Sequence, residues 1–276
     1  MPLITMPREM GSLGKDVASA VAARIGKSVV HHEITEQLAN KMRLRKSHVM
    51  RFLDGTAGIF EKLTTDQTSL SIFTADEVFR MVSEDNVAVI RGWGVTHLLG
   101  SVPHVIRVRV CAPFDLRVKH MMERLNTTDQ ALVEKEIRLS DEALTAITRR
   151  HYDIDWKDAE HYDLVLNTER VSVEDCVNEV MTLMNTPRFR ETDESRQTLR
   201  DLGIVASVRA ALRQDDRTKK LDVTIASSHN QVTLSGMAGD AAESEQAAQI
   251  AAAVHGVSGV DNQLKTTTRA HRRFDS

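Results

Sequence analysis

The order of apolar and polar positions at the start of the chain predicts a strand, a loop and a helix. Residues 3–6 are a short apolar run, and the loop that follows contains Gly11 and Gly14. Beyond the loop, apolar residues recur every four positions from Val17 to Ile25, which is the spacing of one helix face. A strand, a glycine-containing loop and a helix in this order are typical of the beginning of a parallel α/β domain.

The same alternation of strands and helices continues to residue 184. Apolar runs at 87–90, 105–112 and 162–167 predict strands of a buried parallel sheet. Thr74 and Ser172 are the expected N-caps of two helices. Helices are expected at 32–62 (interrupted at 54–58), 74–83, 115–125, 129–151 and from 173 onward.

The pattern changes after residue 184. Residues 185–203 are polar and charged, and we expect them to form a linker. A small α+β unit of order αββαβ follows. Apolar and polar residues alternate along its strand segments, which separates them from the helical segments. Its expected elements are helix 204–212, strands 221–225 and 231–236, helix 240–254 and strand 257–265, followed by a basic tail at 269–276.

Composition fits two ordinary globular domains. The chain has 276 residues, of which 41% are hydrophobic and 27% charged, and its net charge is −3. This balance gives no reason to expect nonspecific binding to nucleic acid or to anionic membranes. No apolar run is long enough for a transmembrane segment, and the N-terminus lacks the features of a secretory signal. We therefore expect a cytoplasmic protein, with Cys111 and Cys176 as reduced core residues.

Four segments of the first domain resemble the cytidylate kinase-like family of P-loop kinases. They are REMGSLGK at 8–15, RGWG at 91–94, VCAPFDLR at 110–117 and YDLVLNT at 162–168. The resemblance covers roughly residues 3–184. It implies a three-layer α/β domain over residues 1–184, nucleotide binding, and ATP with Mg²⁺ as cofactors.

Two segments of the second domain resemble a BON domain. They are VTLSG at 232–236 and HGVSGVDN at 255–262, within a domain expected over residues 204–268. The resemblance implies binding to a phospholipid surface or to a protein partner. We find no candidate catalytic group in this domain.

The loop before the first helix is a candidate phosphate-binding loop. Its backbone N–H groups and the dipole of the following helix would favour an anion. Compared with the pattern GxxxxGK[ST], Glu9 replaces the first glycine and Asp16 replaces the Ser/Thr. Lys15 would contact the β- and γ-phosphates, and Asp16 would hold Mg²⁺ through a bound water or else repel the phosphates. The expected cofactor-binding residues are Gly11, Ser12, Leu13, Gly14, Lys15 and Asp16. The alternative is a plain glycine turn.

The glycine-rich turn at 91–94 is the candidate substrate site, because α/β folds place ligands beyond the ends of buried strands. The resembled family often has an arginine where Trp93 stands; Trp93 could stack on a base or simply close the turn. The expected substrate-binding residues are Arg91, Gly92, Trp93, Gly94 and Arg117.

Phosphoryl transfer needs cations around the transferring group more than it needs an acid or a base. In addition to Lys15, the candidate catalytic residues are Arg149 and Arg150, in the region that resembles the kinase lid. The alternative interpretation is that both are solvated arginines on a helix surface. Leu144 stands near where the family often has a lid arginine. The segment 31–33, His-His-Glu, is interpreted as a helix start and not as a metal site.

Three functions follow from these observations. The first is an ATP–Mg²⁺-dependent kinase acting on a nucleoside monophosphate, with CMP as the favoured acceptor. The second is a nucleotide-binding or regulatory protein without catalysis, as Glu9, Asp16, Trp93 and Leu144 would suggest. The third is a scaffold that acts through its BON-like domain.

Overall fold

The computed structural model describes residues 1–7, 9–30, 67–83, 87–92 and 94–266. The helix expected over 32–62, the segment 31–33, Trp93 and the basic tail 269–276 lie outside these ranges. None of the described helices is both long and apolar enough to cross a membrane.

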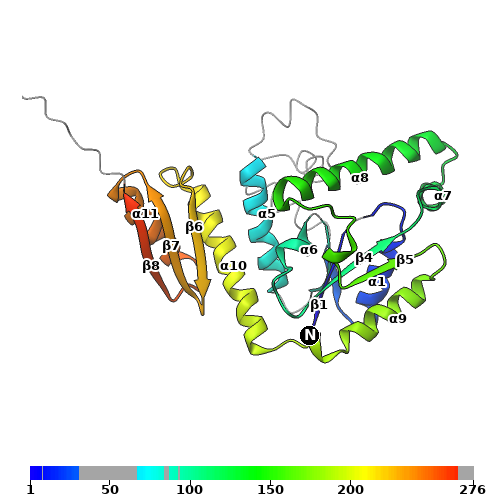
Figure 1. Cartoon of the computed structure of the whole chain (residues 1–276), viewed down its shortest axis with the longest axis horizontal. Helices are drawn as coiled ribbons and strands as arrows, with labels where there is room; N and C mark the ends of the chain where they lie inside the picture. Colours follow the sequence, from blue (N-terminus) through cyan, green and yellow to red (C-terminus); the bar gives the residue numbers. More distant parts are fainter. Residues whose placement is uncertain (8, 31–66, 84–86, 93, 267–276) are drawn as a thin grey trace, which may run out of the picture. The chain divides into compact units, whose positions relative to one another are not determined.

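Five parallel strands form the sheet of the N-terminal part, in the order β2-β3-β1-β4-β5. Strands β1, β4 and β5 are labelled in Figure 1. The strands are β1 Leu3–Met6, β2 Ser28–Val30, β3 Val87–Arg91, β4 Val105–Cys111 and β5 Leu164–Asn167. Four of them were predicted as apolar runs. The sequence did not reveal β2, which has only three residues and carries Ser28 exposed at its start.

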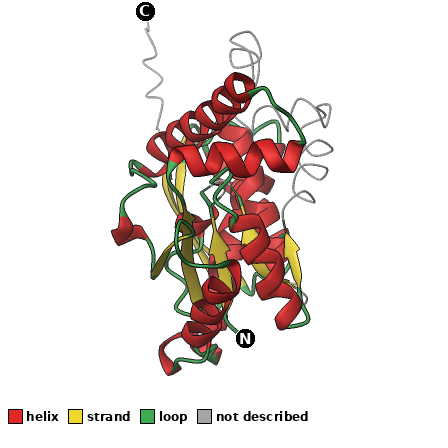
Figure 2. Cartoon of the chain, turned by 90° about the vertical axis from the view of Figure 1, so that its right-hand side faces the viewer, coloured by secondary structure: helices red, strands yellow, loops and turns green. Residues whose placement is uncertain are grey.

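Helices flank this sheet, and Figure 2 shows the strands among them. Helices α1 and α9 contribute Val17 and Val177 to one core with Ile4, Val89 and Val108 of the strands. The two cysteines are free; Cys176 is buried in this core, whereas Cys111 at the end of β4 is only half-buried. The helical elements are α1 Gly14–Arg24, α6 Val95–Leu98, α7 Phe114–Leu125, α8 Gln130–Tyr152, η1 Ala159–His161, α9 Val173–Met184 and η2 Pro187–Phe189.

One expected helix cap is confirmed and one is wrong. Ser172 caps α9, since its Oγ accepts a hydrogen bond from Asp175 N at 3.1 Å. Thr74 lies inside α5 (Gln67–Val82) and donates from Oγ1 to the Leu70 carbonyl at 2.7 Å. A threonine hydroxyl can bond to the carbonyl four residues back as well as cap a helix start, so Thr74 alone could not mark the beginning of α5.

The C-terminal part has the predicted order αββαβ. Strands β6 and β7 pair antiparallel, and β8 joins β7 in parallel. His229 and Asn230 both have positive φ in the hairpin turn, as a two-residue turn between twisted strands requires. The elements are α10 Asp193–Gln214, β6 Val223–Ser228, β7 Gln231–Ala238, α11 Ala241–Ala253 and β8 Gly259–Thr266. Their core contains Val208, Val232, Leu234, Ala247 and Ala251.

The internal contacts of the chain divide it into two units, Met1–Gln67 with Met81–Ser195, and Thr68–Arg80 with Arg196–Ser276. Most of α5 thus groups with the C-terminal unit, where Ser207 Oγ donates to Asp76 at 2.7 Å. Helix α10 is longer than the predicted 204–212, so residues 193–203 of the expected linker are helical. The sequence missed this half of α10 because it is strongly polar. The domain limits at residues 184 and 204 stay a prediction.

Asp201 of α10 holds the β6–β7 hairpin. Its carboxylate accepts hydrogen bonds from Ser227 Oγ at 2.6 Å, His229 N at 3.0 Å and Asn230 N at 2.9 Å. Partial burial acts to raise the pKa of Asp201, but these bonds and one from Gln197 outweigh it and hold the pKa below its ordinary value. The ionised carboxylate therefore stabilises the hairpin.

We expect Asp201→Asn to lower the free energy of unfolding of the C-terminal unit by about 1 kcal/mol at pH 7, since backbone donors lose a charged acceptor. A carboxylate whose pKa is lower in the folded state than in the unfolded state stabilises the fold at pH values above its ordinary pKa. This stabilisation disappears as the pH falls through the pKa of the folded state. The difference between the variant and the wild type should therefore shrink below about pH 4. Thermal unfolding at pH 7 and pH 3 measures it. Asp216→Asn, on an exposed carboxylate that contacts Lys219, is the control; an equal effect of both variants at pH 7 would refute the assignment.

Candidate phosphate-binding site

The loop between β1 and α1 is closed by its own hydrogen bonds. The side chain of Ser12 is fully buried; its Oγ donates to the Glu9 carbonyl at 2.8 Å and accepts from Gly14 N at 3.3 Å. Gly11 and Leu13 both adopt positive φ, at +81° and +62°, and α1 begins immediately afterwards at Gly14. The loop is therefore a compact turn directed into the N-terminus of a helix.

Gly11 lies against the backbone of α7. A Cβ at this position would lie 2.5 Å from the Arg117 carbonyl oxygen. We expect Gly11→Ala to destabilise the N-terminal unit by about 1–3 kcal/mol, from backbone strain and overlap together. Gly26→Ala is the matched control, because Gly26 also has positive φ (+65°) but meets nothing within 4 Å. Thermal unfolding should show a clearly larger loss for Gly11→Ala, and equal losses would contradict the close approach.

Arg117 of α7 lies under the loop. It is 4% exposed, and its Nε donates to the Met10 carbonyl at 2.8 Å. The rest of its guanidinium pairs with Glu9 at 3.1 Å and with Asp141 of α8 at 3.0 and 2.9 Å. The structure thus places this expected substrate-binding residue in an internal ion-pair network that supports the loop.

Two further residues of α7 contact the loop. His120 Nδ1 donates to the Gly11 carbonyl at 2.9 Å, so this nitrogen carries the ring proton. Arg124 donates to Asp16 Oδ2 at 2.5 Å. The sequence places Arg117, His120 and Arg124 on one helix face, at spacings i, i+3 and i+7. The structure shows that this face holds the loop from Met10 to Asp16.

Glu9, which replaces the first glycine of the phosphate-loop pattern, is a buried anchor. Its Oε2 lies 3.6 Å from Arg109 Nε, and its Oε1 faces Arg117. Burial raises the pKa of Glu9, and the two arginines only partly offset this effect. Sequence reasoning missed Arg109; the signal was the pair Arg107 and Arg109, at alternate positions of an otherwise apolar strand.

Lys15 is the free cation of the loop. It is exposed in the first turn of α1, and it forms no hydrogen bond or ion pair with any residue that the structure describes. Asp16 beside it is 42% exposed and keeps one carboxylate oxygen beyond the bond to Arg124. An unpaired ammonium at a helix N-terminus is an arrangement suited to binding an anionic group.

The turn at the end of β3 is the second candidate region. Arg91 is buried, at 6% exposed, and Gly92 has φ +151° with open space where a Cβ would stand. Gly94 has φ +65° and precedes α6, and the ring of Tyr152 lies directly against its Cα. A side chain at Gly94 would collide with this ring.

The candidate catalytic arginines lie on the last turns of α8. Arg149 and Arg150 are exposed, and Arg149 Nη2 lies 3.6 Å from Asp155 Oδ2. Within the described ranges, neither forms a hydrogen bond or ion pair with the loop at 9–16. Leu144 of the same helix is buried, at 3% exposed, and belongs to the packed side of α8.

Solved structures of low sequence identity are similar to the chain. An uncharacterized protein from Eubacterium ventriosum is 18% identical, with a TM-score of 0.53 over 67% of this chain and 98% of that one. A shikimate kinase from Acinetobacter baumannii in complex with shikimate is 15% identical (69% and 96% covered, TM-score 0.40). A shikimate kinase from Bacteroides thetaiotaomicron is 13% identical (67% and 99% covered, TM-score 0.39). None of the curated proteins matches the chain.

Family models match both parts of the chain. The BON domain model matches residues 200–268, in agreement with the small mixed sheet and its helices. The model of the cytidylate kinase-like family matches residues 3–170, which is more than half of the chain. The five-stranded parallel sheet with flanking helices has the arrangement of a P-loop kinase fold. The chain therefore belongs to the cytidylate kinase-like family and carries a C-terminal BON domain.

Proposed function

We propose that the N-terminal unit binds ATP with Mg²⁺ at the loop of residues 9–16 and transfers a phosphoryl group to a nucleoside monophosphate, with CMP as the favoured acceptor. The observation that carries this proposal is the free ammonium of Lys15 at the start of α1. The other charges of the loop are paired, Glu9 with Arg117 and Asp16 with Arg124. Lys15 is therefore the cation of the loop that is left for an anionic ligand.

The residues of the loop fit a phosphate chain and a hard divalent cation. Lys15 would contact the β- and γ-phosphates, and the first N–H groups of α1 would add the positive end of the helix dipole. Asp16 offers a carboxylate oxygen, the ligand type that Mg²⁺ prefers, beside its bond to Arg124. A bound Mg²⁺ would supply charge neutralisation at the phosphates. Arg117 and His120 keep the loop in one conformation, so its donors need little reorganisation.

The acceptor would bind at the turn of residues 91–94. Gly92 leaves its backbone open to close approach, and Arg91, the last residue of β3, is our candidate for a guanidinium contact with the acceptor phosphate. Arg149 and Arg150 are our candidates for the cations that neutralise the transferring group, because both are exposed and Arg149 has only a long contact with Asp155.

A coupled ADP-release assay on the full chain tests this function. With ATP–Mg²⁺ present, we expect turnover with CMP and slower turnover with dCMP or UMP. The rate with CMP should fall at least about 100-fold in Lys15→Ala. Lys119→Ala, on an exposed lysine of α7, should retain the wild-type rate. Absence of turnover with all three acceptors would refute phosphoryl transfer to these nucleotides.

A non-catalytic nucleotide-binding protein is the second candidate function. It is favoured by Arg117, because its guanidinium already donates hydrogen bonds to Glu9 and Asp141. It is also favoured by the buried Leu144, which stands where the resembled family often has an arginine. ATP binding without ADP release would support this function over the kinase.

For the BON domain we propose binding to a phospholipid surface or to a protein partner, in line with the family match. Flotation of the full chain with vesicles of anionic lipid tests the first option. Flotation that is absent with both anionic and zwitterionic vesicles would leave the protein partner.

A further inference from the structure

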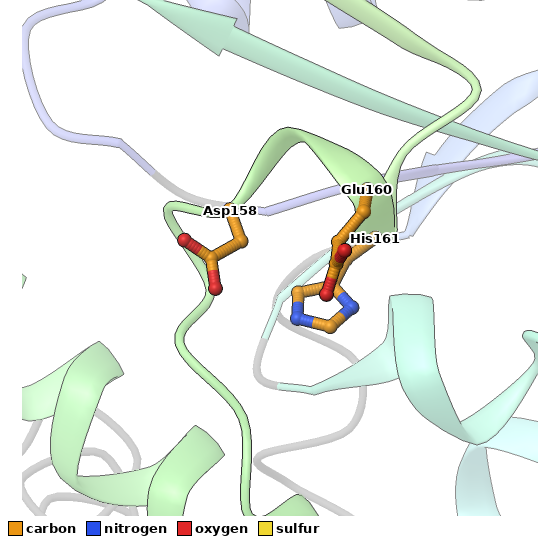
Figure 3. A group of neighbouring side chains, drawn as sticks. All are labelled: Asp158, Glu160 and His161. Carbon is orange, nitrogen blue, oxygen red and sulfur yellow. The ribbon is translucent and has the colours of Figure 1, made fainter.

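Three side chains that can bind a metal converge at the short helix η1, outside the phosphate-binding loop. Asp158, Glu160 and His161 each place one potential ligand atom within 4.8 Å of the others. Figure 3 shows the two carboxylates and the imidazole ring gathered on one side of this turn. The backbone of η1 brings them together, since His161 N donates to the Asp158 carbonyl at 3.4 Å.

The two carboxylates have no other evident task in the fold. Asp158 stands at the N-cap position of η1, yet its carboxylate does not cap the helix. Within the described part of the chain, none of the three side chains forms a hydrogen bond or an ion pair. Two carboxylates held close together without a cation repel each other, and a bound cation would remove this repulsion.

The ring of His97 of α6 packs against the ring of His161. Their ring centroids are 5.3 Å apart at an interplanar angle of 84°, an edge-to-face contact.

We propose that Asp158, Glu160 and His161 bind a divalent transition metal ion, Zn²⁺. One imidazole and two carboxylates suit Zn²⁺, and the imidazole disfavours Mg²⁺ and Ca²⁺, which prefer all-oxygen sites. Ligand atoms at about 2.1 Å from a tetrahedral zinc are about 3.4 Å apart. The potential ligand atoms now lie within 4.8 Å of one another, so zinc binding would require the exposed Asp158 and Glu160 side chains to move closer to His161. Three protein ligands leave the fourth position to water.

Isothermal titration of the chelator-treated full chain with Zn²⁺ tests this site. We expect the wild type to bind one ion that His161→Ala loses or binds at least about 30-fold more weakly. The double variant Asp158→Asn/Glu160→Gln should show the same loss. Circular dichroism should show that these variants remain folded, because Asp158 and Glu160 are exposed without a partner among the described residues and His161 is only partly buried.

Controls separate this site from other histidines of the chain. His255→Ala, on an exposed histidine of the C-terminal unit, should bind Zn²⁺ as the wild type does. Lys15→Ala should also bind as the wild type does, which distinguishes this site from the nucleotide site. An unchanged Zn²⁺ affinity in His161→Ala would overturn the proposal. Loss of Zn²⁺ binding in a His31→Ala/His32→Ala variant, and not in His161→Ala, would also overturn it.

Discussion

Replacing Arg117 by alanine is expected to lower the free energy of unfolding of the N-terminal unit by about 3–5 kcal/mol. The guanidinium is 4% exposed and pairs with two carboxylates, Glu9 and Asp141, of which Glu9 is 5% exposed at its side chain. Its loss also removes the donor to the Met10 carbonyl. The cost is large because the buried carboxylate of Glu9 keeps only its longer contact with Arg109, at 3.6 Å, among the described residues, and Asp141 loses the guanidinium altogether. Urea denaturation of the full chain, followed by a probe in the N-terminal unit, measures it.

Two variants test this explanation. Arg124→Ala removes an arginine from the same helix face, but its pair with Asp16 is 37% and 42% exposed and should contribute less than about 1 kcal/mol. Adding Glu9→Gln to Arg117→Ala should recover part of the lost stability, because one of the unpaired charges disappears. Equal losses for the two single variants, together with no recovery, would show that burial of charge is not the cause.

Replacing Lys15 by alanine is expected to weaken ATP–Mg²⁺ binding by about 10- to 150-fold, which corresponds to the loss of about 1.5–3 kcal/mol from a charged hydrogen bond. The stability of the protein should not change, since Lys15 is exposed and has no partner among the described residues. Competition with a fluorescent ATP analogue measures the affinity. Lys119→Ala, which leaves the loop intact, is the control. An ATP affinity that is the same in both variants would remove Lys15 from the site.

Much of the architecture could be predicted from the sequence, because buried parallel strands are continuous apolar runs. The strands at 3–6, 87–90, 105–112 and 162–167 have this character, and the structure confirms each within a few residues. The order αββαβ of the C-terminal unit could be predicted because apolar and polar residues alternate along its strands. The shared face of Arg117, His120 and Arg124 was also visible from helical spacing alone. The sequence could not say that this face contacts the loop, since that depends on the packing of α7.

The remaining features depend on long-range contacts. Glu9 differs from the phosphate-loop pattern, and only its pairing with Arg109 and Arg117 explains why a carboxylate is buried there. The group at Asp158, Glu160 and His161 carried no recognisable spacing, because an irregular turn brings the side chains together. The polar first half of α10 has no apolar stripe in its sequence, so helical periodicity could not reveal it.

Isothermal titration of the full chain with ATP in the presence of Mg²⁺ tests the central claim most directly. The proposal predicts saturable binding of one ATP per chain with a dissociation constant at or below about a millimolar, weakened by Lys15→Ala. Binding heat or a thermal shift that is absent at millimolar ATP–Mg²⁺ would contradict it, and the loop at residues 9–16 would then be a structural turn without a nucleotide ligand.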